Sequence, residues 1–333
     1  MNRISVRFAT PRFACVAALL ALSLPAMRVA AQEQAPAGSE VSAPAPAGPP
    51  TFPKPNPDDF TAATPTKDTV NAFLQANWGY DENRIWQVQA ILKTPAEGVA
   101  KIVVFVGDKT GKQKPTALQF FSMPDGKHIA AGNDIIPFGD KPFAENRATL
   151  QKRADGPFRG SVSKDLEIVE FADFQCPHCK AAQPNMEKLA ADFPKARIVF
   201  MPFPLTTIHP AAFTAAAYGA CVTKEGGNDA FFLFANTVFD GQDGLNTQDG
   251  ATMTLNSAVA KAGQDPAKIA ACATTPAIKA QVESWIKLAK DMDINETPSL
   301  SINGRIVPVG NFPYEVLKQI VTYQAKLDGV SVK

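Results

Sequence analysis

The sequence lacks the features that would place it in several large protein classes. It has five cysteines among 333 residues, too few for a disulfide-dense scaffold. Its 33 basic and 32 acidic residues nearly balance, whereas nucleic-acid-binding proteins usually carry a basic surplus. No apolar run reaches the roughly 18 residues that a membrane-spanning helix needs. With 45% hydrophobic and 20% charged residues, the composition is that of a globular protein, and the length suggests about two domains.

The N-terminus has the pattern of a secretory signal peptide over residues 1–31. Arg3, Arg7 and Arg12 form a basic region before an apolar stretch, Phe13 to Leu24, and Val29-Ala30-Ala31 offers small residues for cleavage near Ala31. We therefore expect a periplasmic or secreted protein, and the alternative is an uncleaved membrane anchor. Export would place the remaining four cysteines in a compartment where disulfides persist.

Residues 32–66 are rich in Pro and Ala and have almost no apolar periodicity. We expect an extended, disordered linker, and the alternative is a segment that packs along the surface. Residues 67–155 then predict a small α+β domain with an antiparallel sheet. Its expected elements are helices at 67–78 and about 141–153, and strands at 84–92, 99–106, 116–123 and 128–131.

From 160 to 333 the expected order of elements changes to β-α-β, a helical block and β-β-α. A buried-type strand near 166–171 leads into a helix at 176–193 and a second strand at 198–203. The helical block is an Ala-rich region at about 209–292. The closing elements are strands at 299–303 and 306–309, joined through Asn303-Gly304, and a helix from 313 to about 327.

One motif carries chemistry: Cys176-Pro177-His178-Cys179, at the point where a strand gives way to a helix. A helix N-terminus stabilises an anion, because its backbone N–H groups are free and its dipole is positive there. With Cys176 as N-cap and Pro177 at the first helical position, we expect a lowered pKa for Cys176, to which a charged His178 would add. A low thiolate pKa stabilises the reduced form, so the Cys176–Cys179 disulfide would be a strong oxidant.

The spacing of the two cysteines suits a disulfide that opens and closes. We expect Cys176 to be the exposed attacking thiol and Cys179 the shielded resolving thiol. The alternatives are a zinc site and a static disulfide. Zinc normally takes four ligands, and the sequence has no second Cys-x-x-Cys or His-x₃₋₅-His motif, so we expect no metal and no cofactor.

The segment from Glu170 to Cys179 resembles the active site of DsbA-type thiol–disulfide oxidoreductases, in the thioredoxin superfamily. Pro184 is similar to the kink proline of the thioredoxin active-site helix, and Thr297-Pro298 is similar to the cis-proline loop of the family. The helical block corresponds to the DsbA-type insertion. The resemblance implies an α/β, thioredoxin-like fold with a helical insertion over 160–333.

The resemblance also implies roles for individual residues. Cys176 forms a mixed disulfide with the substrate, and Cys179 resolves it. Pro298 in cis exposes the backbone of Thr297 for pairing with the substrate chain. Glu170 falls where the family keeps a buried acid beneath the disulfide, which can move the Cys179 proton; the alternative is a surface strand residue.

Four more residues carry weaker expectations. Some DsbA-like proteins have a second cysteine pair, and once Cys176 pairs with Cys179 the natural second bridge is a structural Cys221–Cys272 disulfide. The alternative is two buried free thiols. We expect Asp173 to be a turn or surface acid, and His209 a capping or groove-lining residue.

The N-terminal domain affects which function is expected. Met123–Lys127, followed by a helix that joins a thioredoxin module, is similar to the dimerisation domain of DsbC- and DsbG-type isomerases; the alternative is an unrelated cystatin-like or other α+β domain. Three functions follow: an exported oxidase, a homodimeric isomerase or reductase, and a chaperone-like substrate-binding protein. We favour the oxidase. It would act on reduced or misoxidised secreted proteins, be reoxidised by a DsbB-like, quinone-linked membrane partner, and bind no nucleic acid.

Overall fold

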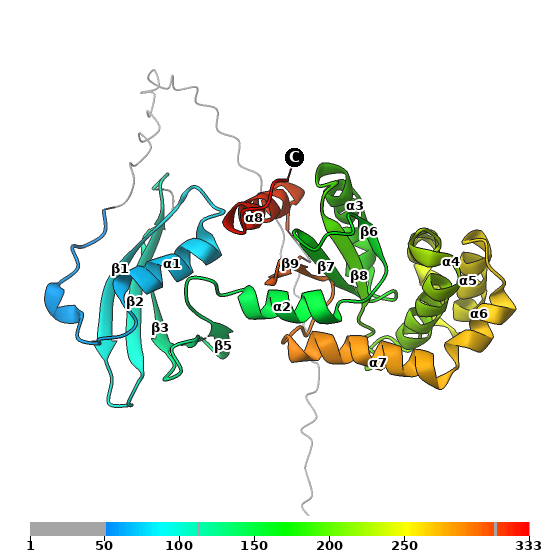
Figure 1. Cartoon of the computed structure of the whole chain (residues 1–333), viewed down its shortest axis with the longest axis horizontal. Helices are drawn as coiled ribbons and strands as arrows, with labels where there is room; N and C mark the ends of the chain where they lie inside the picture. Colours follow the sequence, from blue (N-terminus) through cyan, green and yellow to red (C-terminus); the bar gives the residue numbers. More distant parts are fainter. Residues whose placement is uncertain (1–50, 112–113, 310–311, 333) are drawn as a thin grey trace, which may run out of the picture. The chain divides into compact units, whose positions relative to one another are not determined.

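Two five-stranded sheets organise the part of the chain that the computed structural model describes, residues 51–111, 114–309 and 312–332 (Figure 1). The expected signal peptide, 1–31, lies outside these residues. Each helix of the described part is too short or too polar to cross a membrane.

The first sheet is antiparallel and keeps its strands in chain order. Helix α1 (Lys67–Trp78) begins at Thr66, whose hydroxyl accepts the N–H of Thr69, and its Phe73 and Leu74 join the core of this sheet. The strands are β1 (Arg84–Lys93), β2 (Ala100–Asp108), β3 (Thr116–Ser122), β4 (His128–Ala131) and β5 (Asp134–Pro137). The predicted helix and first four strands are confirmed. The sequence analysis missed β5 because this strand is only four residues long and follows directly after a turn.

Residues 51–66 are packed, which corrects the expectation of an extended linker over this part of 32–66. The ring of Phe52 stacks on that of Phe105, with centroids 6.2 Å apart. The N–H of Ala62 donates to the carbonyl of Ile91 at 3.1 Å. Phe60 also packs against the core of the first sheet. These contacts place 51–66 along the surface of the first sheet, which is the alternative interpretation of this segment.

The second sheet has the strand order β10-β9-β7-β8-β6. Strands β7 and β8 are parallel and entirely buried, and the other pairs are antiparallel. The strands are β6 (Phe158–Gly160), β7 (Glu167–Ala172), β8 (Arg197–Pro202), β9 (Ser299–Ile302) and β10 (Arg305–Pro308). Strand β6 begins two residues before 160, where we expected this domain to start.

Helices cover the second sheet. Helix α3 (Pro177–Asp192) connects β7 to β8, so the carboxyl end of β7 leads straight into the start of α3. Residues of α3 and α8 (Tyr314–Leu327) form one hydrophobic core with the sheet. Helix α2 (Ala144–Arg153) precedes β6 and contributes Leu150 to the other core of this sheet.

The predicted helical block lies between β8 and β9 and is confirmed as four helices and a 3₁₀ turn. The elements are α4 (Ala212–Asp240), η2 (Gln242–Asn246), α5 (Gln248–Lys261), α6 (Pro266–Ala273) and α7 (Pro276–Asp291). Helix α4 is broken at Gly227, whose φ of 76° suits a residue without a Cβ. This insertion shares one hydrophobic core with β7 and β8.

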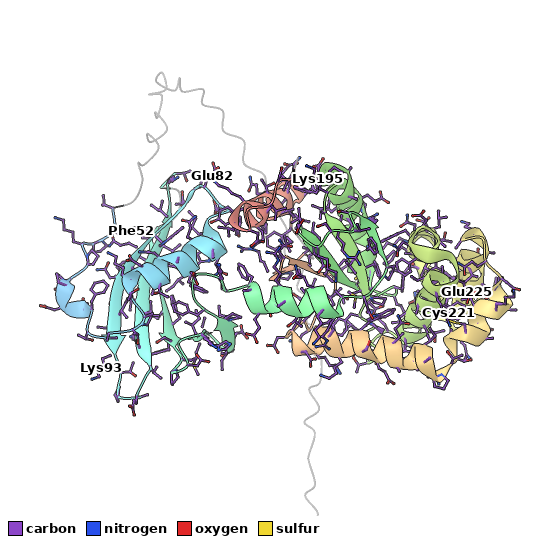
Figure 2. The ribbon with its side chains drawn as sticks, viewed as in Figure 1. Phe52, Glu82, Lys93, Lys195, Cys221 and Glu225 are labelled. Carbon is purple, nitrogen blue, oxygen red and sulfur yellow. A yellow bond between two sulfur atoms is a disulfide. The ribbon has the colours of Figure 1, made fainter. Side chains whose placement is uncertain are left out.

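A disulfide joins two helices of the insertion. Cys221 of α4, labelled in Figure 2, is bonded to Cys272 of α6, as we expected from the resemblance. Cys221 is fully buried. The bond closes a loop with a sequence separation of 51 residues, which restricts the unfolded chain.

Replacing both Cys221 and Cys272 with Ala should lower the free energy of unfolding by about 4 kcal/mol, because a loop of this length loses its cross-link in the unfolded state. Denaturant titration of the variant and the wild-type protein measures this difference. An unchanged free energy of unfolding would show that the bond contributes nothing to stability.

Candidate active site

The active-site segment, which ends at Cys176, packs on an aromatic cluster. It runs from Asp173, just after β7, to Cys176, just before α3. Phe174 is 1% exposed and stacks on Phe200 of β8, with ring centroids 5.2 Å apart. The insertion supplies the remaining rings around Phe174: Phe231, Phe234 and Phe239. The position of the segment therefore depends on the insertion as well as on the sheet.

Cys176 is the N-cap residue of α3, as predicted. Its φ and ψ of −77° and 121° are extended, and Pro177 occupies the first helical position, where its missing N–H leaves no donor unpaired. Pro177 and His178 are exposed. Cys176 is more enclosed than we expected for an attacking thiol, with 5% of its surface exposed, because the loop at Thr297 covers it. Cys179 is completely buried, as expected.

The two thiols have opposite pKa shifts. A hydrogen bond from the Cys179 thiol is the largest cause that lowers the pKa of Cys176 to about 5, against the opposing effect of burial, and Thr297 adds to the lowering. Burial raises the pKa of Cys179. The predicted low pKa of Cys176 thus has a different main cause: the backbone N–H groups of Cys179 and His178, at the helix start, make smaller contributions than the neighbouring thiol.

The loop before β9 lies against Cys176. The Thr297–Pro298 peptide bond is cis, as the resemblance implies. The Sγ of Cys176 lies 3.5 Å from the carbonyl oxygen of Thr297. The Cys176 sulfur is therefore in contact with backbone from a part of the chain that is far away in sequence.

Glu170 is buried in β7 and is not the surface strand residue of the alternative interpretation. Only 3% of it is exposed. The amide of Gln183 donates both to the Glu170 carboxylate, at 2.9 Å, and to the carbonyl of Cys179, at 3.1 Å. Burial raises the pKa of Glu170 to about 7, opposed by Gln183 and by the charge of Arg159. Glu170 is therefore a carboxyl group with a raised pKa. The side chain of Gln183 links it to the backbone of Cys179.

Asp173 is a turn acid, as expected, since its carbonyl accepts the N–H of Cys176 at 3.1 Å, but it is buried and does not lie at the surface. Its carboxylate accepts the N–H of Gln175 and of Leu205, each at 2.7 Å, and lies 2.8 Å from Nδ1 of His209. The N–H of Asp173 points at the Sγ of Cys179, at 3.4 Å. His209 thus fixes the active-site segment through Asp173 rather than capping a helix or lining a groove.

Two glutamines at this site carry no signal in the sequence. The Gln175 amide donates to the carbonyl of Leu245 at 3.1 Å, and its oxygen accepts the N–H of Ala211 at 2.9 Å. Gln242 donates to two carbonyls of the active-site segment. Both glutamines are buried and join the segment to the insertion. No local pattern reveals such partners, because they lie about 70 residues apart and belong to different elements.

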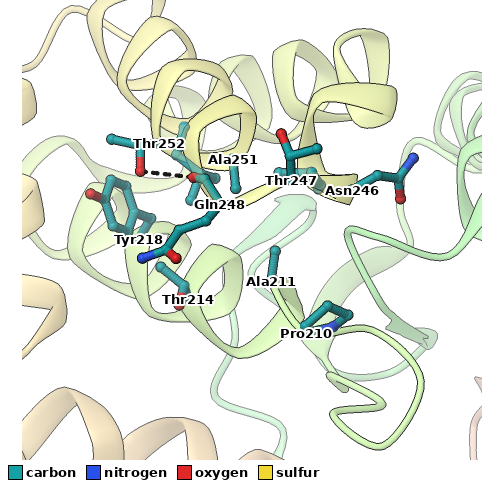
Figure 3. A pocket seen from close by; sticks show the side chains of 11 residues that line it. Pro210, Ala211, Thr214, Tyr218, Asn246, Thr247, Gln248, Ala251 and Thr252 are labelled. Atoms are coloured by element: carbon teal, nitrogen blue, oxygen red, sulfur yellow. Dashed lines mark hydrogen bonds between the residues drawn. The ribbon is translucent and has the colours of Figure 1, made fainter.

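A pocket of about 410 Å³ adjoins this contact between Gln175 and the insertion (Figure 3). Ala211 and Leu245, which bond to Gln175, form part of its wall. All of its lining residues are uncharged, so it offers hydrogen-bonding groups but no counter-charge for an ionic ligand. The polar lining side chains are Thr214, Tyr218, Asn246, Thr247, Gln248 and Thr252.

Comparison with known proteins places the similarity over this second sheet and its insertion. A family model described as thioredoxin matches residues 152–322. It leaves the preceding residues unmatched, so the DsbC- or DsbG-like character of 67–155 stays a prediction.

Individual relatives match this chain over a short part or at low sequence identity. The Na⁺/H⁺ antiporter NhaA 3 of Salinispora tropica is 34% identical over 91 residues, which are 27% of this chain and 14% of the antiporter. The probable disulfide bond formation protein D of Bacillus anthracis is 24% identical over 201 residues, 58% of this chain and 86% of that protein. The solved thiol-disulfide exchange protein alpha-DsbA2 of Wolbachia pipientis is 20% identical, with a TM-score of 0.46 over 56% of this chain and 96% of the other.

Cys179→Ala should raise the pKa of Cys176, because the substitution removes the hydrogen bond that lowers it most. Cys179→Ser retains a donor and serves as the matched control. Thiolate absorbance against pH should give a midpoint near 5 for the wild type, a similar one for Ser and a clearly higher one for Ala. Equal midpoints for Ala and Ser would contradict the assigned cause.

Glu170 should make the folded state less stable as the pH rises. Its pKa is higher in the folded state, so between pH 4.5 and about 7 the folded protein binds more protons than the unfolded chain. The unfolding free energy of the wild type, minus that of Glu170→Gln, should therefore fall by about 3 kcal/mol across this window. Urea titrations at several pH values measure it, and a flat difference would place the carboxyl in a water-like environment.

Proposed function

The chain belongs to the thioredoxin family, and from that premise we propose that it is a thiol–disulfide oxidoreductase that works through Cys176 and Cys179. One observation carries the proposal: two thiols at a helix start, one with a pKa lowered to about 5 and the other buried with a raised pKa. A thiolate is both the better nucleophile at neutral pH and the better leaving group when its pKa is low. Cys176 meets both conditions.

The favoured direction is oxidation of the substrate. A substrate thiolate attacks Sγ of Cys176 in the Cys176–Cys179 disulfide, which breaks that bond and releases Cys179 as a thiolate. A second substrate thiolate then attacks the substrate sulfur of the mixed disulfide and releases Cys176. Two electrons pass from the substrate to the protein, and the low pKa of Cys176 favours the reduced product.

The neighbouring residues have proposed supporting roles. Cys179 needs a proton as it leaves, because burial disfavours its thiolate. Glu170 can supply it, since its pKa of about 7 keeps it partly protonated near neutral pH. Pro177 and His178 expose the helix start to the substrate, and Thr297 and Pro298 offer backbone beside the sulfur.

The proposed setting is the periplasm or the exterior of the cell, after cleavage near Ala31. The proposed substrates are reduced or misoxidised exported proteins, and a membrane-bound redox partner would restore the disulfide. The Cys221–Cys272 bond agrees with an oxidising compartment. A homodimeric isomerase or reductase is the second candidate, favoured by the additional sheet of residues 84–137.

Oxidised protein mixed with reduced, denatured ribonuclease should transfer its disulfide and restore ribonuclease activity. Cys176→Ser should abolish transfer, because the Cys176–Cys179 disulfide cannot form and the remaining Cys179 is buried. Cys179→Ser, mixed instead with scrambled ribonuclease, should accumulate a mixed disulfide, because Cys176 attacks a ribonuclease disulfide and releases one ribonuclease thiol; mass spectrometry detects it. Full transfer by Cys176→Ser would refute the proposal. With scrambled ribonuclease as substrate, activity only of the reduced protein would favour the isomerase.

A further inference from the structure

Gln242 of the insertion makes two hydrogen bonds to the backbone of the active-site segment. It lies at the start of η2 and is 6% exposed. Its side-chain amide nitrogen donates to the carbonyl of Phe174 at 2.8 Å and to the carbonyl of Cys176 at 2.9 Å. One amide group thus holds the backbone on both sides of Gln175.

The carbonyl of Cys176 is a critical acceptor in this structure. It is the N-cap carbonyl of α3 and also accepts the N–H of Cys179 at 3.1 Å and of Lys180 at 3.2 Å. Those two bonds start the helix and set where Cys179 stands relative to Cys176. The amide of Gln242 approaches from the insertion and fixes the same oxygen, so the helix start is held from two elements.

A second hydrogen bond joins the 3₁₀ turn that contains Gln242 to the active-site segment. Gln175 reaches in the opposite direction, to the carbonyl of Leu245 in the same 3₁₀ turn. The two glutamines therefore form reciprocal bonds between η2 and the segment. Both are buried, where the loss of a donor to a carbonyl costs more than it would at the surface.

We propose that Gln242 is a positioning residue for the reactive sulfur: its amide locks the N-cap carbonyl of Cys176, so that the sulfur stays within reach of the Cys179 thiol and of the Thr297 loop. The inference rests on the proposed function of Cys176 and Cys179. It gives the helical insertion a part in the chemistry, because η2 belongs to the insertion and the cysteines do not.

The formal charges around Cys176 do not change when Gln242 is replaced by a neutral residue. The titratable or charged groups on the elements around Cys176 include His178, Cys179 and Lys180 of α3, Glu170 of β7, Asp173 after it, His209 before α4, Asp240 at the end of α4, Asp243 of η2, and Glu296 before the Thr297 loop. A change in the titration of Cys176 would then report its position, because the set of charges stays the same.

The test compares Gln242→Met with Gln264→Met. Gln264 also lies in the insertion and donates its amide to a backbone carbonyl, that of Val222, at 3.0 Å, but it does not contact the active-site segment. Both substitutions keep side-chain length and remove one donor group. Thiolate absorbance against pH, the alkylation rate of reduced protein at pH 5 and the free energy of unfolding are measured for each variant.

Gln242→Met should raise the pKa of Cys176 by about one unit and slow its alkylation at pH 5 about fivefold, as the thiolate fraction falls. Gln264→Met should leave both values unchanged. If both variants only lose stability and Cys176 titrates as in the wild type, Gln242 is merely structural and the proposal is overturned.

A second variant guards against loss of the fold. Gln242→Glu keeps the shape of the side chain, cannot donate when ionised and places a negative charge beside the segment, so it should raise the pKa of Cys176 more than Met does. A wild-type titration in this variant would also overturn the proposal. Failure of disulfide transfer is a separate result, because the pKa of Cys176 is measured without any substrate.

Discussion

The hydrogen bond between two sulfurs of unequal burial is the interaction on which the site depends. Cys179 is completely enclosed and holds its proton, and that proton stabilises the thiolate of Cys176. The helix start assists this arrangement, but its main effect is geometric: one turn of helix places the second thiol behind the first. Anything that moves Cys179 relative to Cys176 therefore alters the reactivity of the pair.

The insertion contributes to that geometry from the opposite side of the segment. Phenylalanines of α4 enclose Phe174, Gln242 of η2 holds the N-cap carbonyl, and His209 holds Asp173. The Asp173 backbone in turn donates to the sulfur of Cys179. A thioredoxin-like sheet can present a helix start without these contacts. Here the insertion holds the segment through these contacts, which suits a site whose chemistry depends on distances between sulfurs.

Sequence reasoning succeeded where the information is local. The Cys-Pro-His-Cys spacing, the caps and the Asn-Gly turn act over a few residues, so they predicted the helix start and the closing hairpin. It failed where burial is decided by distant partners. Asp173 has the local pattern of a turn acid, yet His209 and Leu205 bury it. Gln242 resembles any polar residue after a helix. The Pro-rich segment 51–66 was misjudged because two phenylalanines outweigh its composition.

The two edge strands of the second sheet, β6 and β10, affect how a protein proposed to act on unfolded chains can contact them. Strand β6 spans three residues, and β10 spans four and finishes at Pro308, which cannot donate to a further strand. Gly160, at the end of β6, has a φ of 84° and turns the chain away from the sheet. An extended client therefore finds little backbone at the edges of this sheet to which it could add as a further strand.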